Sequence, residues 1–286
     1  MPMPTVVDLK VLIHFGFPKT GSSTLQYGLF KPLHDRGILN LKTWRQEDST
    51  EHLDRRPSSC LFAGGKILPE YLDFSENRLN ILSDESFTAP IKLRQNNYGN
   101  EICDPFSFPQ KIKEQIVARY GGQIEFIPMI VIRNQPQLIF SQYVEEYNLK
   151  KYKGVDLIFD ESNNICIEGF EIYQFAKYID ILENVFGQGK VEVFLFEEWT
   201  RDLQSFCEKQ SRIIDVDTAT IAGLLSKSHE NKKHKASGGY FTKDGETLIP
   251  HLNDTQISGI QTFFEKDNSQ LKRFIDEARL IKFGYL

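Results

Sequence analysis

The chain has 286 residues, of which 40% are hydrophobic and 26% charged, a composition typical of a globular protein with a sizeable core. Its net charge of −5 argues against a nucleic-acid or anionic-membrane surface, which would need a basic excess. With no leader-like N-terminus and no run near the ~18 to 20 apolar residues of a membrane span, we expect a cytoplasmic protein. Its 4 cysteines are widely spaced, so we expect reduced thiols and no zinc site.

Residues 9–35 have the pattern of a strand, a tight loop and a helix. The apolar run 9–15 predicts a buried strand, and Gly16 and Gly21 punctuate the turn that follows it. Hydroxyl side chains at 22–24 open an amphipathic helix. Backbone N–H groups are unpaired at a helix N-terminus, which also carries partial positive charge. The segment therefore predicts a binding site for a phosphate or a sulfate.

The position of Lys19 distinguishes this loop from an ATP-binding loop. A Walker A loop has its lysine after the second glycine, whereas Gly16-Phe-Pro-Lys-Thr-Gly-Ser-Ser places Lys19 inside the loop. The run resembles the 5′-phosphosulfate loop of sulfotransferases that use 3′-phosphoadenosine 5′-phosphosulfate (PAPS). In motif style it is most similar to bacterial and heparan-sulfate-type carbohydrate sulfotransferases. The resemblance implies that the co-substrate is bound by Pro18, Lys19, Thr20, Gly21, Ser22, Ser23 and Thr24.

Residues 40–78 are polar, charged and interrupted by proline and glycine. We expect loops and short helices that cover a cleft, in which His52 and Arg55 contact an anionic acceptor. For any one of these side chains, a solvated charged face is the commoner explanation.

The run 80–87 is predicted to be a second strand that ends in carboxylates. Asp84 and Glu85 follow its apolar residues, as expected where a parallel strand delivers side chains to a ligand-binding edge. One interpretation is a Walker B strand that holds Mg²⁺. The other is that Glu85 is a general base for the acceptor hydroxyl, with Asp84 or His52 as the fallback. The partial resemblance of Glu85-Ser86-Phe87 to the catalytic segment of the heparan-sulfate-type enzymes favours Glu85, although both carboxylates could simply cap a turn.

A third segment combines a strand, an arginine and a serine. After a predicted helix at 109–120, the run 129–132 predicts a buried strand that ends at Arg133, and a helix is expected from Pro136. Arg133 and Ser141 could both face an anion at the sheet edge. The spacing resembles the second sulfotransferase signature, R-[DN]-P-x-x-x-x-x-S, although Gln135 is inserted before the proline. The resemblance implies that Arg133 and Ser141 bind the 3′-phosphate of PAPS.

The remaining chain continues the alternation of strands and helices. We expect a helix over 168–187, a strand over 190–196 that leads into a helix, and terminal helices over 253–266 and 268–282. The basic stretch 226–245 is predicted to be a cleft-covering loop. By family resemblance it closes over the nucleotide, with Lys235 and Ser237 as candidate contacts; a basic surface loop is the alternative.

Together these features predict a single α/β domain over 1–286, a P-loop-type three-layer α/β/α sandwich with a central parallel sheet. The resemblance implies a sulfotransferase that moves a sulfuryl group from PAPS to an acceptor hydroxyl, with Glu85 as base and Lys19 stabilising the leaving group, and no metal. We expect a glycan or glycan precursor as acceptor, and no nucleic-acid partner or membrane span. The alternatives are an ATP/Mg-dependent kinase that uses Asp84, and a non-catalytic nucleotide-binding protein of the same fold.

Overall fold

A computed structural model describes residues 9–44, 56–91, 102–150, 169–227, 235–236, 239–241, 245 and 248–286, with only the backbone for 146–150 and 235–236. Within these ranges no helix is both long and apolar enough to cross a membrane.

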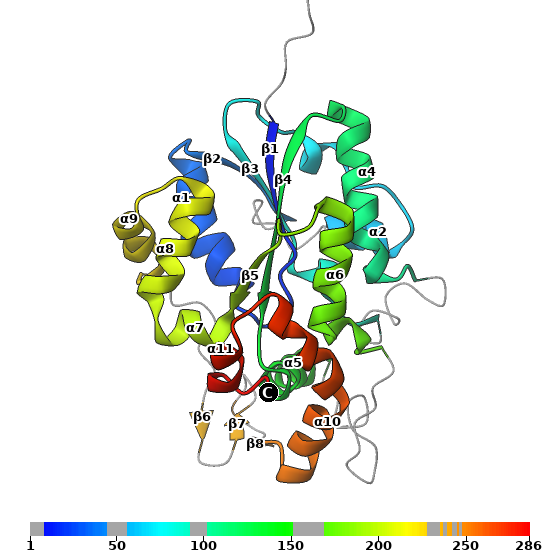
Figure 1. The fold of residues 1–286 in the computed structure, drawn as a ribbon, viewed down its shortest axis with the longest axis vertical. Coiled ribbons are helices and arrows are strands. Elements are labelled where there is room, and N and C mark those ends of the chain that lie inside the picture. The colour runs from blue at the N-terminus through cyan, green and yellow to red at the C-terminus, as the bar shows by residue number, and fades with distance from the viewer. Residues whose placement is uncertain are drawn as a thin grey trace, which may run out of the picture.

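A parallel sheet of 5 strands in the order β2-β3-β1-β4-β5 forms the centre of the molecule (Figure 1). The strands other than β2 are mostly apolar, as expected when both faces of a parallel sheet are covered by helices, whereas β2, at the edge of the sheet, alternates apolar and polar residues. The strands are β1 (Leu9–His14), β2 (Leu39–Lys42), β3 (Leu79–Ser83), β4 (Ile124–Ile132) and β5 (Glu192–Leu195). The predicted first, second and third strands are therefore confirmed, and β2 is an additional edge strand within the stretch expected to be loops.

Helices cover both faces of this sheet and complete the three layers. One face is covered by η1 (Thr24–Phe30, a π-helical segment), α1 (Lys31–Asp35), α7 (Phe196–Arg201), α8 (Leu203–Ile214) and α9 (Thr218–Leu225). The other is covered by α2 (Pro57–Phe62), α4 (Phe108–Tyr120) and α6 (Phe175–Phe186). The C-terminal helices α10 (Asp254–Gln270) and α11 (Glu277–Lys282) lie at the carboxyl end of the strands, where α10 packs against α6 (Figure 1). Short 3₁₀ segments are η4 (Pro69–Leu72), η5 (Glu85–Thr88), η7 (Pro105–Ser107), η9 (Glu171–Tyr173) and η10 (Leu271–Arg273).

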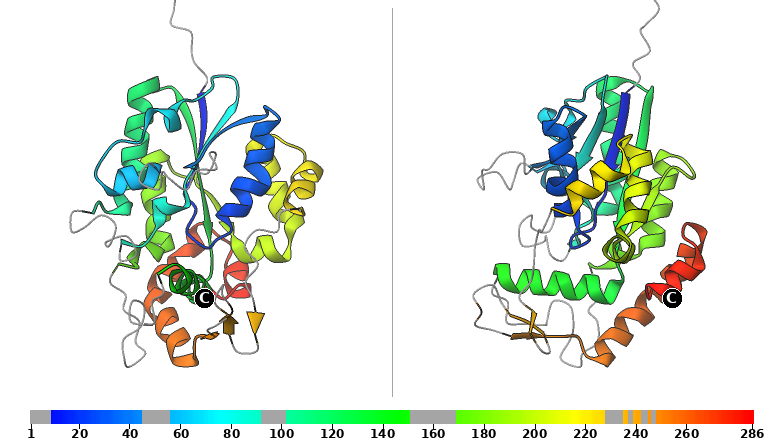
Figure 2. Two further views of the ribbon diagram at one scale, coloured as in Figure 1. Left: turned by 180° about the vertical axis from the view of Figure 1, so that it is seen from behind. Right: turned by 90° about the vertical axis from the view of Figure 1, so that its left-hand side faces the viewer.

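The carboxyl edge of the sheet is crossed by one long helix, α5 (Gln135–Lys150), which runs beneath the strands in the right-hand view of Figure 2. A small antiparallel sheet of β6 (Lys235–Ala236), β7 (Gly239–Phe241) and β8 (Leu248–Pro250) lies on the far side of α5. Short strands pair within 226–245, the stretch predicted to be a cleft-covering loop.

Three predicted helices also need correction. The predicted 168–187 helix is divided into η9 and α6, and Gln174 between them has non-helical dihedral angles. The terminal helices, predicted over 253–266 and 268–282, have other bounds, because α10 extends to Gln270 and α11 begins only at Glu277. In each case the apolar spacing identified a buried segment but not the bounds of the helix. The side chain of Asp276 caps the start of α11, whereas Gln174 makes no side-chain capping bond at the start of α6.

Candidate functional site

The loop between β1 and η1 is held in a conformation that few sequences permit. Lys19 and Gly21 both have positive φ, 70° and 86°. A side chain at Gly21 would collide with the indole of Trp199, so glycine is required by both backbone and space. Lys19 has no such freedom, and a non-glycine residue in this region costs roughly 1 to 3 kcal/mol unless its surroundings hold it.

The loop closes on one carbonyl, that of Phe17. The Thr20 hydroxyl donates to Phe17 O at 2.6 Å, its N–H donates to the same oxygen at 3.3 Å, and the Ser22 hydroxyl lies 3.4 Å from it. The helix then starts with the bond from Leu25 N to Gly21 O. Both donors of Thr20, a predicted phosphate ligand, thus serve the turn in this structure.

The arginine at the end of β4 contacts the first loop directly. Arg133 Nη1 donates to Lys19 O at 2.9 Å, and its guanidinium carbon lies 4.6 Å from the centre of the Phe196 ring. Burial lowers the pKa of Arg133, and the Glu197 carboxylate acts in the opposite direction. Arg133 Nε is buried and has no hydrogen-bond partner among the described residues. The two predicted phosphate-binding segments therefore meet at Lys19.

Behind Arg133, Glu197 ties three parts of the chain together. Its carboxylate accepts from Asn134 N and from the Tyr285 hydroxyl, each at 2.9 Å, and only 4% of the residue is exposed. Burial raises the pKa of Glu197. This carboxylate therefore anchors the start of α5 and the C-terminal residues to α7, beside the arginine.

The two carboxylates after β3 have different surroundings. Asp84 is fully buried, and its oxygens accept from Ser58 N at 3.0 Å and Ser86 N at 2.9 Å. Glu85 begins η5 and is partly exposed. The same turn is joined to the first loop, because Thr88 Oγ1 donates to Gly16 O at 2.8 Å. Asp84 thus caps a turn, whereas Glu85 remains the partly exposed carboxylate beside the loop.

Beneath the loop lies a buried polar network that links β1, β3 and η1. Gln26 Nε2 donates to Ser83 Oγ at 2.9 Å, and Ser83 Oγ lies 2.8 Å from His14 Nδ1. Ser83 Oγ and His14 Nδ1 share one hydrogen bond, and the tautomer of the imidazole ring sets which of the two atoms donates it. Nε2 lies under Gly16, where an added Cβ would approach it to 2.8 Å. Burial lowers the pKa of His14 to about 4, so the ring is neutral at pH 7.

The amine of Lys19 has a partner that the sequence reasoning missed. Lys19 Nζ lies 3.0 Å from Glu145 Oε2, and the two side chains are 18% and 32% exposed. Glu145 follows Ser141 by four residues on α5, and positions four apart share a helix face. That spacing was the signal that could have identified it.

The other predicted site residues are placed as follows. Ser141 is 6% exposed on α5, and Pro18, Ser22 and Ser23 are buried in the first loop. The backbone of Lys235 pairs with that of Tyr240, and the Tyr240 ring packs with those of Phe140 and His251. This contact places the late basic segment against α5. His52, Arg55 and Ser237 lie outside the described residues.

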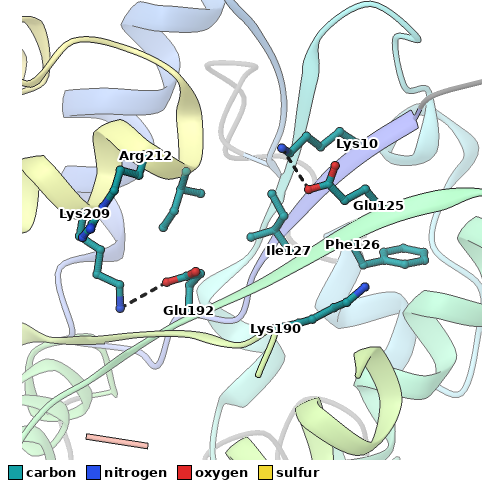
Figure 3. A pocket seen from close by; sticks show the side chains of 9 residues that line it. Lys10, Glu125, Phe126, Ile127, Lys190, Glu192, Lys209 and Arg212 are labelled. Atoms are coloured by element: carbon teal, nitrogen blue, oxygen red, sulfur yellow. Dashed lines mark ion pairs between the residues drawn. The ribbon is translucent and has the colours of Figure 1, made fainter. Parts of the chain in front are cut away.

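A cavity of about 580 Å³ lies at the opposite, amino edge of the sheet (Figure 3). Its lining includes two ion pairs, Lys10 with Glu125 at 3.0 Å and Lys209 with Glu192 at 3.3 Å. None of the predicted site residues lines it. Within the described ranges, no group of three or more His, Cys, Asp or Glu side chains is placed to hold a metal ion.

No protein-family model matches the chain, and no curated protein matches it. Among solved structures, a sulfotransferase from Alicyclobacillus acidocaldarius aligns with a TM-score of 0.51 and 15% identity, over 92% of this chain and 94% of that one. A mouse sulfotransferase in complex with PAP aligns over 96% of this chain and 88% of that one, with a TM-score of 0.42 and 12% identity. The first likeness shows that this chain has the fold found in a sulfotransferase.

Proposed function

We propose that the protein transfers a sulfuryl group from PAPS to an acceptor hydroxyl and leaves adenosine 3′,5′-bisphosphate (PAP). One observation supports the proposal: the hydrogen bond from Arg133 Nη1 to Lys19 O, 2.9 Å long, joins two separate segments that are each predicted to bind an anion. A donor with phosphates on both its 5′ and 3′ positions needs two such sites side by side. A donor with a single phosphate chain does not.

In this proposal the first loop binds the 5′-phosphosulfate. The N–H groups of residues 21–24 and the hydroxyls of Ser23 and Thr24 hold the phosphate at the start of η1. Lys19 neutralises the charge that grows on the oxygen between sulfur and phosphorus as that bond breaks. An in-line displacement through a loose transition state depends mainly on such positioning and charge stabilisation, by analogy with phosphoryl transfer.

Arg133 and Ser141 bind the 3′-phosphate. The guanidinium is held against Phe196 and the Lys19 carbonyl, so its geometry is fixed before a ligand arrives. A half-buried, prearranged arginine offers a planar fork that suits phosphate oxygens. The β6–β7 segment with Lys235 packs against the same helix and supports its proposed role as a cover for the nucleotide.

Glu85 takes the proton of the acceptor hydroxyl as the new oxygen–sulfur bond forms. It is the partly exposed member of the pair that follows β3, whereas both oxygens of Asp84 accept backbone N–H groups. The same two hydrogen bonds weigh against a kinase in which Asp84 holds Mg²⁺, because each carboxylate oxygen of Asp84 already accepts a backbone N–H group.

We propose a carbohydrate hydroxyl as the acceptor, on the strength of the motif style of the first loop and of Glu85-Ser86-Phe87. The test is incubation of the purified chain with ³⁵S-labelled PAPS and a panel of glycans, lipids and small phenols, with Lys19→Ala as the inactive control. Labelled glycan is the expected product. Labelling of phenols or lipids alone would overturn the acceptor class, and no labelled product with any acceptor would support a non-catalytic protein.

A further inference from the structure

The ion pair between Lys19 and Glu145 plays no part in the chemistry proposed above, yet it occupies the amine on which that chemistry depends. The two side chains come from residues 126 positions apart and meet at 3.0 Å in a half-buried place. A partly desolvated pair interacts more strongly than one on the open surface, because less water screens the charges. The contact therefore fixes where the amine rests.

Lys19 is held from the same segment at both of its ends. Arg133, at the end of β4, binds its carbonyl, and Glu145, on the helix that follows, binds its amine. Lys19 itself has a backbone φ of 70°, a conformation that persists in a non-glycine residue only when surrounding contacts hold it. The β4–α5 segment therefore sets both the backbone and the side-chain position of this one loop residue.

From this arrangement we propose that Glu145 is a positioning residue for Lys19, which holds the amine beside the loop when no donor is bound and yields it when the phosphosulfate enters. This inference rests on the proposed function. The carboxylate competes with the donor for the same amine and repels the incoming phosphates. Donor binding is therefore weaker than the loop alone would permit.

The first measurement is calorimetric titration with PAP of the wild type and of Glu145→Gln, which keeps the side-chain shape and removes the charge. We expect Glu145→Gln to bind PAP about three- to tenfold more tightly, the size expected for losing a competing, partly buried ion pair. A merely structural role for Glu145 would change affinity in the other direction, because a loosened loop binds less well.

The matched control is Glu125→Gln. Glu125 forms an ion pair of the same length with Lys10, at the opposite edge of the sheet. Removing it changes the net charge of the protein equally but leaves the first loop untouched. We expect its PAP affinity to equal that of the wild type.

The second measurement is mass-spectrometric mapping of lysine acetylation in the nucleotide-free protein. Glu145→Gln should speed acetylation of Lys19 several-fold and leave Lys10 unchanged, while Glu125→Gln should do the reverse. Equal acceleration at both lysines would mean general loosening and would overturn the positioning role. So would unchanged or weaker PAP binding by Glu145→Gln when the wild type binds PAP. Absence of PAP binding by the wild type would overturn the proposed function and, with it, this inference.

Discussion

At the scale of single residues, the pair Asp84 and Glu85 shows how neighbours of the same chemistry take different roles. The carboxylate of Asp84 is fully buried and accepts two backbone N–H groups, one from α2 and one from η5. Glu85 is the first residue of η5 and is partly exposed. Burial and hydrogen bonding thus separate a structural acid from a candidate catalytic base.

Substitution of the two carboxylates should therefore give opposite results. Glu85→Gln should lower turnover by at least ~10², the lower end for losing a general acid–base group, with an unchanged melting temperature. Asp84→Asn should instead lower stability by about 1 to 3 kcal/mol, because one buried N–H loses its acceptor. Steady-state kinetics with labelled PAPS and thermal denaturation test the two variants. Near-wild-type turnover in Glu85→Gln would contradict its role as base.

The buried ring of His14 makes a separate prediction about pH. In the unfolded chain this histidine takes up a proton near pH 6.5, whereas burial lowers its pKa in the folded protein to about 4. Between these values the unfolded state binds more protons, so the free energy of unfolding decreases as pH falls from about 6.5 to about 4, by up to about 3 kcal/mol. Above pH 7 the ring has no effect.

Urea denaturation at a series of pH values should show this loss of unfolding free energy. In His14→Asn the decrease in unfolding free energy between pH 6.5 and pH 4 should be smaller by about the same amount. Equal slopes in the two proteins would show that the ring is not buried in its neutral form.

At the scale of elements, helix α5 carries Ser141 and Glu145 and is fastened to α10 by a buried pair of side-chain amides. Gln135, the residue inserted into the family-like signature, lies at the start of this helix and is 1% exposed. Its side chain exchanges two hydrogen bonds with Asn268 of α10, 2.7 and 3.1 Å long. The departure from the commoner pattern therefore has a structural reason, which is to fasten α5 to α10.

Removing one member of this buried amide pair leaves the other without a partner. Gln135→Ala and Asn268→Ala should each lower the free energy of unfolding by about 1 to 3 kcal/mol. The double variant should lose clearly less than the sum, because the two side chains share one interaction. Chemical denaturation of the three variants measures this, and strictly additive losses would show that the two amides act independently.

The sequence predicts the elements that local patterns define and misses those that depend on pairing or on the placement of other elements. The apolar runs at 9–15 and 129–132 and the turn residues at 16–21 identify strands and a loop locally, so β1, β4 and the first loop were predictable. The short edge strand β2 depends on pairing with β3, which lies far along the chain, and apolar periodicity does not reveal such pairing. The strands β6, β7 and β8 pair with their neighbours in sequence, but each is too short to show an apolar period. The contact between Lys19 and Glu145 likewise exists only after α5 is placed across the sheet edge.

At the scale of the whole molecule, the parallel sheet separates two charged regions. Its carboxyl edge gathers the first loop, Glu85, Arg133 and the overlying α5, where parallel sheets commonly bind ligands. Its amino edge carries the open cavity whose lysines Lys10 and Lys209 are paired with glutamates. The fold thus brings together, at one edge of the sheet, two segments that are predicted to bind anions and are far apart in sequence.

The central claim is that these two motifs form one site for a nucleotide phosphorylated at both its 3′ and 5′ positions. Calorimetric titration of the wild-type protein with PAP, and separately with ATP plus Mg²⁺, tests it most directly. The account predicts that PAP binds at least ~10-fold more tightly, since hydrogen bonds to a charged group contribute about 1.5 to 3 kcal/mol. Tighter binding of ATP plus Mg²⁺ than of PAP would contradict it.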